Sequence, residues 1–338
     1  MTRRSAFVAG GLALLAVVAL AVWWRAAPDP DPVPPRPVPA DDLPRFSGEN
    51  ALAHVETQVA FGPRIPGSEG HRAMRAWLRD TLTALGARVN EQTFRYVAPH
   101  DPTIRYDGVN VIAQFHTERT PRIMLAAHYD TRAVGDADPD PAKRALPVPG
   151  ANDGGSGVAV LVELARLLRD HPLPGDAGVD LVFFDVEDAG EQMSDAEAAR
   201  LAQGGYAAEP RVPFAIGSRA FVEANPAYRP RYGVLLDMVG DRNLRIPREG
   251  YSQRYAGPVL DRVFAAARAV GATAFVDEPG PPIEDDHIAF LQVGLPVVDL
   301  IHAPFPATWH TTADTPANVS AESLGQVGAV VVRMLWGE

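Results

Sequence analysis

The sequence contains no cysteine in its 338 residues. This absence excludes disulfides, a cysteine nucleophile, iron–sulfur clusters and every zinc site built on thiolates. Lysine is nearly absent too, since Lys143 is the only lysine among 31 basic residues. A Schiff-base or P-loop lysine would have to be this residue, which lies in a proline-rich stretch without a suitable motif.

Positive charge is also in short supply. The formal net charge is −11 at pH 7, whereas a nucleic-acid binder needs a basic face to contact phosphates. We therefore expect no nucleic-acid partner. The hydrophobic fraction of 46% and the charged fraction of 22% are those of an ordinary folded protein.

The N-terminal residues 1–25 contain an uncharged run at 6–24 with arginines on both sides. The run is just long enough to span a bilayer as a helix, and Trp23 and Trp24 suit the membrane interface. We expect a signal anchor. A cleaved signal peptide is the alternative, because residues 19–21 are small enough for cleavage. The arginines before the run predict an extracytoplasmic body, periplasmic or at the cell surface.

Residues 26–45 contain eight prolines. Such a composition is typical of a semi-rigid polyproline spacer, with a docking motif for a partner as the alternative. We therefore expect a linker at 26–45 and the folded body at 46–338.

The body alternates helical patterns with short apolar runs rich in β-branched and aromatic residues. This order predicts a single α/β domain whose largely parallel central sheet is flanked by helices. The expected helices lie near 49–60, 70–86, 156–170, 216–225, 255–270, 284–293 and 320–335, and the expected strands at 109–115, 123–127, 179–185, 233–237 and 296–301.

Polar residues follow four of these strands. His128 and Asp130 end one strand, the pair Glu187 and Asp188 follows another, and Asp237 ends a third. His310 lies in the loop after the last strand. Because sites in open α/β sheets form beyond the carboxyl ends of the strands, we expect these side chains to meet at one edge.

Asp153 lies in the glycine-rich stretch 152–157, directly before a predicted helix. It can cap that helix, bind a ligand, or do both. Together with the strand-end residues it forms a set that suits zinc, either mononuclear or dinuclear with one bridging carboxylate. The set comprises His128, Asp153, Asp188, Asp237 and His310.

Two neighbours of this set have expected supporting roles. Asp130 is placed to orient the His128 imidazole. Glu187 adjoins Asp188 but points elsewhere if the chain is extended, which is where a general acid and base is needed. Other chemistries are not supported, because Ser156 and Ser218 complete no G-x-S-x-G turn.

In this order, the motifs resemble the zinc-aminopeptidase superfamily, which includes the two-zinc aminopeptidases and the glutaminyl cyclases. The resemblance covers most of the body and implies the fold of that superfamily. Its landmarks are the segments 61–68, 110–113, 128–130, 152–157, 183–188, 236–238 and 309–311.

Within the superfamily the sequence is most similar to the glutaminyl cyclases. The features that favour this are the segments 216–219, 284–288 and 303–306, and the tryptophan directly before His310. The resemblance implies one zinc ion bound by Asp153, Asp188 and His310. It departs from animal cyclases in two places: they have Glu-Glu at the acidic pair 187–188, and they carry a tryptophan within the segment that corresponds to 189–213.

The resemblance also implies roles around the metal. Glu187 would be the proton shuttle, Asp237 and Asp286 would complete a hydrogen-bonded network beside it, and Trp309 would wall the pocket for a glutamine side chain. The implied activity is that of a glutaminyl-peptide cyclotransferase acting on peptides or proteins with a free N-terminus, with a membrane contact through the N-terminal segment.

Two alternatives remain open from the sequence. In a two-zinc aminopeptidase, His128 and Asp237 would hold a second metal, and Glu187 would activate water. In a non-catalytic ectodomain of the same fold, ligands should be missing, whereas this chain retains them.

Overall fold

The computed structural model describes residues 39, 42–99, 101–191 and 212–337. The predicted anchor at 1–25, most of the linker and most of the segment 189–213 lie outside these residues. Among the residues described, no helix is both long and apolar enough to cross a membrane. The first helix of the body starts at Gly48, and Phe46 packs against the core just before it.

Helices and strands alternate along the body, as the apolar periodicity predicts. The helices are α2 (Gly48–Ala60), α3 (Glu69–Ala84), α4 (Gly155–Asp170), α6 (Ile216–Ala224), α7 (Gly250–Tyr255), α8 (Gly257–Val270), α9 (His287–Gln292) and α10 (Ala321–Trp336), with a short 3-10 helix at Pro316–Asn318. The strands are β1 (Arg88–Ala98), β2 (Asp101–Phe115), β3 (Arg122–His128), β4 (Gly178–Phe184), β5 (Pro230–Asp237), β6 (Ile246–Arg248), β7 (Phe275–Pro279) and β8 (Val297–Ile301).

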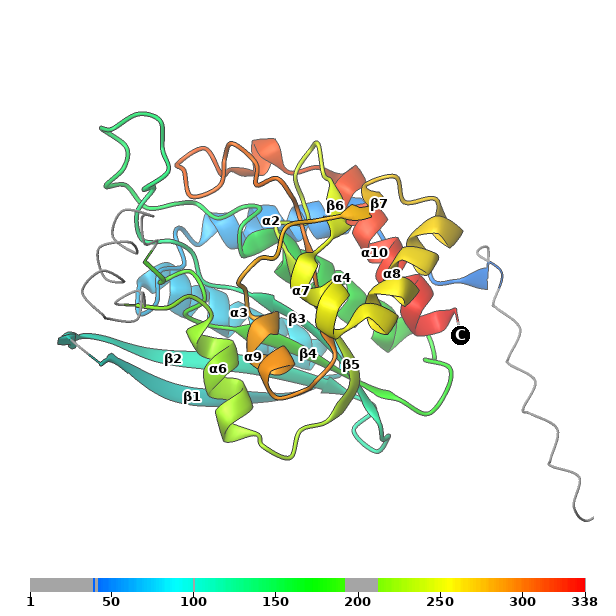
Figure 1. The fold of residues 1–338 in the computed structure, drawn as a ribbon. Coiled ribbons are helices and arrows are strands. Elements are labelled where there is room, and N and C mark those ends of the chain that lie inside the picture. Colours follow the sequence, from blue (N-terminus) through cyan, green and yellow to red (C-terminus); the bar gives the residue numbers. More distant parts are fainter. Residues whose placement is uncertain (1–38, 40–41, 100, 192–211, 338) are drawn as a thin grey trace, which may run out of the picture. The chain divides into compact units, whose positions relative to one another are not determined.

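The central sheet has six strands in the order β1-β2-β4-β3-β5-β8. The last four of these are mutually parallel, whereas β1 and β2 form an antiparallel hairpin that joins the sheet through β4. Figure 1 shows the hairpin at one side of the sheet and helices on both faces. The four parallel strands therefore end at one common edge.

The two faces of the sheet bury two different groups of side chains. On β3, Leu125 packs into the larger core beneath α2, α4, α8 and α10, while its neighbour Ala126 packs into the smaller core with Phe221 of α6 and Phe290 of α9. Because both faces are covered, the parallel strands are largely apolar rather than alternating, with Asp180 of β4 and Asp299 of β8 as buried exceptions. This explains why they are recognisable in the sequence as continuous apolar runs.

Several elements differ from the expected pattern. The whole of β1, the first half of β2 and the small β6–β7 pair are absent from the sequence-based prediction. The helix expected at 255–270 starts only at Gly257, because Ala256 is not helical and separates α7 from α8. Helix α9 begins at His287 rather than near 284.

Candidate active site

The expected site residues meet at the carboxyl edge of the parallel strands. His128 and Asp237 are the last residues of β3 and β5. Asp188 follows β4, and His310 lies in the loop between β8 and α10. Asp153 precedes α4. The structure thus brings together all five residues of the predicted metal-binding set.

These five residues form two groups that share Asp153. In the first, His310 Nε2 lies 3.1 Å from Asp188 Oδ1 and 3.7 Å from Asp153 Oδ2. In the second, His128 Nε2 lies 3.1 Å from Asp153 Oδ1 and 3.2 Å from Asp237 Oδ1. Asp153 therefore turns one oxygen toward each group, which is the arrangement of a bridging carboxylate.

The donor set fits a divalent metal. All five side chains are buried. Asp153 Oδ2 and Asp188 Oδ2 have no hydrogen-bond partner in the described part of the chain. Buried carboxylate oxygens without partners are costly, and imidazole with carboxylate ligands suits zinc. The residues of the first group, Asp153, Asp188 and His310, and those of the second, His128, Asp153 and Asp237, can each hold one ion.

Gly154 fixes how Asp153 enters the site. It has φ of +75°, and a Cβ there would lie 2.5 Å from the carbonyl oxygen of Asp130 and 3.0 Å from the ring of His128. Only glycine tolerates this left-handed turn and this close approach. Gly154 is also the N-cap of α4, and no side chain caps the helix. The idea that Asp153 doubles as the cap is therefore wrong; its carboxylate is free for ligation.

Asp130 organises the acidic pair rather than only the imidazole. Its two carboxylate oxygens accept hydrogen bonds from the backbone N–H groups of Glu187 (3.0 Å) and Asp188 (3.1 Å). It also lies 3.6 Å from His128 Nδ1. Its expected role of orienting His128 is thus the weaker of its two contacts, and its main effect is to fix the turn that carries Glu187 and Asp188.

Three residues at the site adopt left-handed backbone conformations that are unusual without glycine. Val186, directly before Glu187, has φ of 58°, Met238 after Asp237 has 47°, and His310 has 55°. Such conformations cost on the order of 1–3 kcal/mol each and cluster at functional sites. The turn at Val186 ends the extended chain, so the different directions of Glu187 and Asp188 come from this turn and not from strand alternation.

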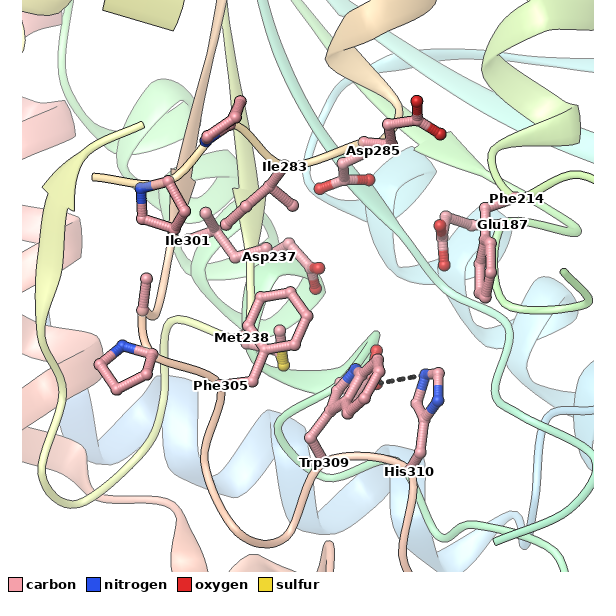
Figure 2. A pocket seen from close by; sticks show the side chains of 16 residues that line it. Glu187, Phe214, Asp237, Met238, Ile283, Asp285, Ile301, Phe305, Trp309 and His310 are labelled. Atoms are coloured by element: carbon pink, nitrogen blue, oxygen red, sulfur yellow. Dashed lines mark ion pairs between the residues drawn. The ribbon is translucent and has the colours of Figure 1, made fainter. Parts of the chain in front are cut away.

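A cavity of about 570 Å³ opens beside the first group of ligands. Figure 2 shows Glu187 and Phe214 on one side, Trp309 and Phe305 on another, and Asp285 and Ile283 on a third. The Trp309 and His310 rings are stacked with centroids 3.8 Å apart, and Phe305 lies 4.8 Å from Trp309. The cavity therefore combines an aromatic wall with a cluster of carboxylates.

The two carboxyl groups opposite the aromatic wall hold protons unusually well. Burial, with the nearby charge of Asp285, raises the pKa of Glu187 well above its usual value, although the charge of His128 opposes this. Burial and the charge of Asp237 raise the pKa of Asp285 to about 7. Groups tuned toward neutral pH in a cavity are candidates for proton transfer.

The ligand groups themselves are electrostatically linked. Burial and Asp153 raise the pKa of Asp188. Burial would raise the pKa of Asp153 as well, but its hydrogen bond and Coulombic attraction to His128 lower it. Burial opposes protonation of His128, yet the surrounding carboxylates raise its pKa well above the usual value. Because the pKa values of His128 and Asp188 are raised, these groups hold protons more tightly without a metal, and a cation would have to displace those protons.

The structure places the remaining predicted residues as follows. Trp309 lines the cavity, as expected. Asp286 is completely buried behind the wall, and neither carboxylate oxygen has a hydrogen-bond partner among the described residues. Burial and Asp285 raise its pKa well above the usual value, although the adjacent Ser218 opposes this. The neighbour Asp285, which sequence reasoning passed over, is the one that faces the cavity.

A third buried group combines Asp285, His287 and Asp299 within 4.8 Å of one another. Its imidazole already has a carboxylate neighbour, because His287 Nε2 lies 3.3 Å from Glu249 Oε2. Sequence reasoning also left His71 without a role. It is buried, 2.8 Å from Asp185 and stacked on Tyr129, and so supports the chain that leads from β4 to the acidic pair.

The model of peptidase family M28 matches residues 110–335, and the chain belongs to this family of enzymes. The glutaminyl-peptide cyclotransferase of Boiga irregularis is 27% identical over 291 residues, covering 79% of this chain and 75% of its own length.

Two solved structures extend the comparison. Bacteroides thetaiotaomicron glutaminyl cyclase bound to N-acetylhistamine aligns with a TM-score of 0.78 and 33% identity, covering 88% of this chain and 100% of its own. A Zn-dependent exopeptidase from Parabacteroides distasonis aligns with a TM-score of 0.76 and 33% identity over the same shares. The predicted superfamily and fold are thereby confirmed, and similarity reaches both cyclases and exopeptidases.

Proposed function

We propose that this protein is a zinc-dependent glutaminyl-peptide cyclotransferase, which converts an N-terminal glutamine into pyroglutamate and releases ammonia. The observation that carries the proposal is one cavity beside the first group of metal ligands, in which the Trp309 ring is stacked on His310 and the Glu187 carboxyl lines the wall. The similarity to glutaminyl cyclases supports it.

The reaction asks for one group that accepts a proton and gives it back. The α-amine of the substrate attacks its own γ-carbonyl carbon, a new C–N bond closes the ring, and the bond to the amide nitrogen breaks. Glu187 takes the proton from the attacking amine and delivers it to the departing ammonia. A buried carboxyl group whose pKa is raised above its usual value is suited to both steps.

The other residues bind and position. Asp153, Asp188 and His310 would hold the metal, which when bound would polarise the γ-carbonyl and stabilise negative charge on its oxygen. Trp309 would pack against the glutamine side chain. Asp237 lines the same cavity, and burial together with the charges of Asp285 and Asp286 raises the pKa of Glu187. Because the attack is intramolecular, no water needs activation.

A two-zinc aminopeptidase is the second candidate, and a specific observation favours it. The second group of ligands, His128, Asp153 and Asp237, is complete and correctly spaced, and an exopeptidase is among the similar structures. In that reaction Glu187 would activate a water molecule for attack on the first peptide bond. A non-catalytic ectodomain finds no support in a site that keeps every ligand.

The experiment that separates the two candidates uses the purified, zinc-loaded protein. It is offered one peptide that begins with glutamine and one that begins with leucine, and the products are identified by mass spectrometry. Loss of ammonia from the glutamine peptide, with the leucine peptide intact, is the expected result. Release of free leucine would establish the aminopeptidase instead.

The expected location follows from the N-terminal segment. We propose that residues 1–25 act as a signal anchor or signal peptide, so that the enzyme meets peptide and protein N-termini outside the cytoplasm. The uncharged run at 6–24 with its flanking arginines supports this. Fractionation of cells that express the full chain, with N-terminal sequencing of the product, tests both location and cleavage.

A further inference from the structure

A buried arginine lies directly behind the first group of metal ligands. Arg132 is 5% exposed. Its Nη1 donates hydrogen bonds to the carbonyl oxygens of Asp188 (3.2 Å) and Gly190 (2.8 Å), and it lies 3.5 Å from Asp188 Oδ1. One guanidinium nitrogen thus holds both the backbone and the carboxylate of a residue that the metal needs.

The rest of the guanidinium binds Asp136. Arg132 Nε donates to Asp136 Oδ1 at 2.7 Å, and Nη2 donates to Asp136 Oδ2, so the pair is bidentate. Bidentate pairs of arginine and carboxylate are stronger and geometrically more specific than single contacts. Asp136 is therefore fixed in orientation although its side chain is partly exposed.

Asp136 in turn faces the other end of the ligand group. Its Oδ1 lies 3.6 Å from His310 Nδ1. That nitrogen is buried and has no hydrogen-bond partner in the described part of the chain. Metal-binding histidines almost always donate their second ring nitrogen to an acceptor, often a carboxylate, and Asp136 is the carboxylate placed to accept it.

Aromatic packing completes the contact. The guanidinium carbon of Arg132 lies 5.5 Å from the centroid of the Phe214 ring, and Phe214 is stacked on His310 at 6.3 Å with an interplanar angle of 16°. Arg132 therefore reaches His310 by two routes, through Asp136 and through Phe214. Asp136 thus faces one nitrogen of the His310 ring, and Phe214 stacks on the plane of that ring.

We propose that Arg132 and Asp136 are positioning residues that pre-organise Asp188 and His310 for the metal. The pair serves only the first group of ligands: within the described residues, the ion pairs of His128 and Asp237 involve no arginine. On this proposal, Asp153, Asp188 and His310 form the tighter of the two sites. The inference rests on the proposed metal site and not on which reaction the metal serves.

The charges of Arg132 and Asp136 predict an order of the variant effects on zinc affinity that packing alone would not predict. A lone guanidinium next to a divalent cation repels it, whereas Arg132 paired with Asp136 contributes orientation with nearly no net charge. Removing Asp136 alone leaves the arginine uncompensated and removes the carboxylate that faces His310 Nδ1. Removing both residues loses the orientation but also removes the repulsion.

The experiment measures zinc affinity by competition with a chelating dye, in the full chain and without substrate. We expect Arg132→Gln to weaken zinc binding about 10- to 100-fold, the range for outer partners of metal ligands. Asp136→Asn should weaken it more than the double variant Arg132→Gln/Asp136→Asn does. Arg132→Lys, which keeps the charge but not the fork, should fall between the wild type and Arg132→Gln.

A second buried pair provides the matched control. Arg122, at the start of β3 and far from the carboxyl edge, donates to Asp180 Oδ1 at 2.6 Å and is also largely buried. Arg122→Gln should lower thermal stability while leaving zinc affinity within about twofold. A loss of zinc affinity in this control equal to that of Arg132→Gln would show a general effect of weakened folding.

Three results would overturn the proposal. The first is unchanged zinc affinity in folded Arg132→Gln and Asp136→Asn, and the second is weaker zinc binding in the double variant than in Asp136→Asn. The third is a wild type that binds no zinc. The cyclase proposal fails on a different result. If the wild type converts no glutamine peptide but the Arg132 and Asp136 variants lose zinc affinity in the predicted order, the proposed reaction is refuted and the positioning role stands.

Discussion

Replacing Glu249 by glutamine should destabilise the fold by about 3 kcal/mol at neutral pH. Glu249 is buried at the start of α7, where Oε1 accepts hydrogen bonds from the N–H groups of Tyr251 and Ile283 and Oε2 accepts one from Ser252 at 2.6 Å. The same Oε2 faces His287. Through Ile283, this carboxylate ties α7 to a wall of the cavity.

Two independent routes give the magnitude. Glutamine keeps one acceptor oxygen but places an NH₂ group against the N–H of Ser252, so one charge-assisted hydrogen bond is lost and a buried donor is left unpaired, together about 3 kcal/mol. Separately, burial alone would raise the pKa of Glu249, but His287 and Ser252 lower it from 4.5 to about 2. That difference corresponds to about 3 kcal/mol of stability.

The sign of the pH dependence follows from the lowered pKa. The contribution of Glu249 is fully present above its unfolded pKa of about 4.5 and is lost as the pH falls toward 2. The difference between wild type and Glu249→Gln should thus be largest at pH 7 and should shrink below pH 4.5. Urea unfolding of the metal-free proteins, followed by tryptophan fluorescence across this range, measures it.

The control is Glu278→Gln. Glu278 pairs with Arg245 at 2.5 Å, but its side chain is 66% exposed, so we expect almost no change. The reasoning is refuted if Glu249→Gln costs less than about 0.5 kcal/mol at pH 7. It is equally refuted if a larger cost persists undiminished at pH 3, since a packing defect would not depend on the protonation of this group.

Three further predictions concern the site and its support. Glu187→Gln should lower kcat at least about 100-fold while zinc content by mass spectrometry stays unchanged; retained activity would exclude the proton-shuttle role. Trp309→Ala should raise KM more than it lowers kcat in steady-state assays if the ring packs on the substrate as proposed; an effect on kcat alone would mean that Trp309 only positions His310, on which it is stacked. His71→Ala should destabilise the protein by about 1–3 kcal/mol in urea unfolding, since the buried Asp185 carboxylate loses its contact with His71 and keeps only the N–H groups of Val109 and Val186; His71→Gln should recover part of this loss.

The sequence predicts the parallel strands and the metal ligands for the same reason. Strands covered on both faces are continuous apolar runs, and the first polar residue after each run stands out, as with His128 and Asp237. By contrast, β1 was missed because no continuous apolar run marks it: exposed and half-buried residues alternate along its second half, and only some of the half-buried ones are apolar. The hairpin is held by pairing with β2, which the local sequence does not encode.

Other features depend on backbone details that residue types do not reveal. Which of Asp285 and Asp286 faces the cavity depends on where α9 begins. The helix starts at His287, directly after Asp286. Asp153 is released from a capping role by the left-handed turn at Gly154. Arg132 and Asp136 carry no recognisable motif, because their importance comes only from lying behind residues far away in the chain.

The distance in sequence between the two histidines of the site has a consequence for biosynthesis. His128 ends β3 in the first half of the chain, whereas His310 lies shortly before α10, the last helix. A ribosome has to complete almost the entire polypeptide before both imidazoles can approach Asp153. If the metal binds as proposed, its loading is a late event, and a chain that ends before His310 has only His128, Asp153 and Asp237 to offer to an ion.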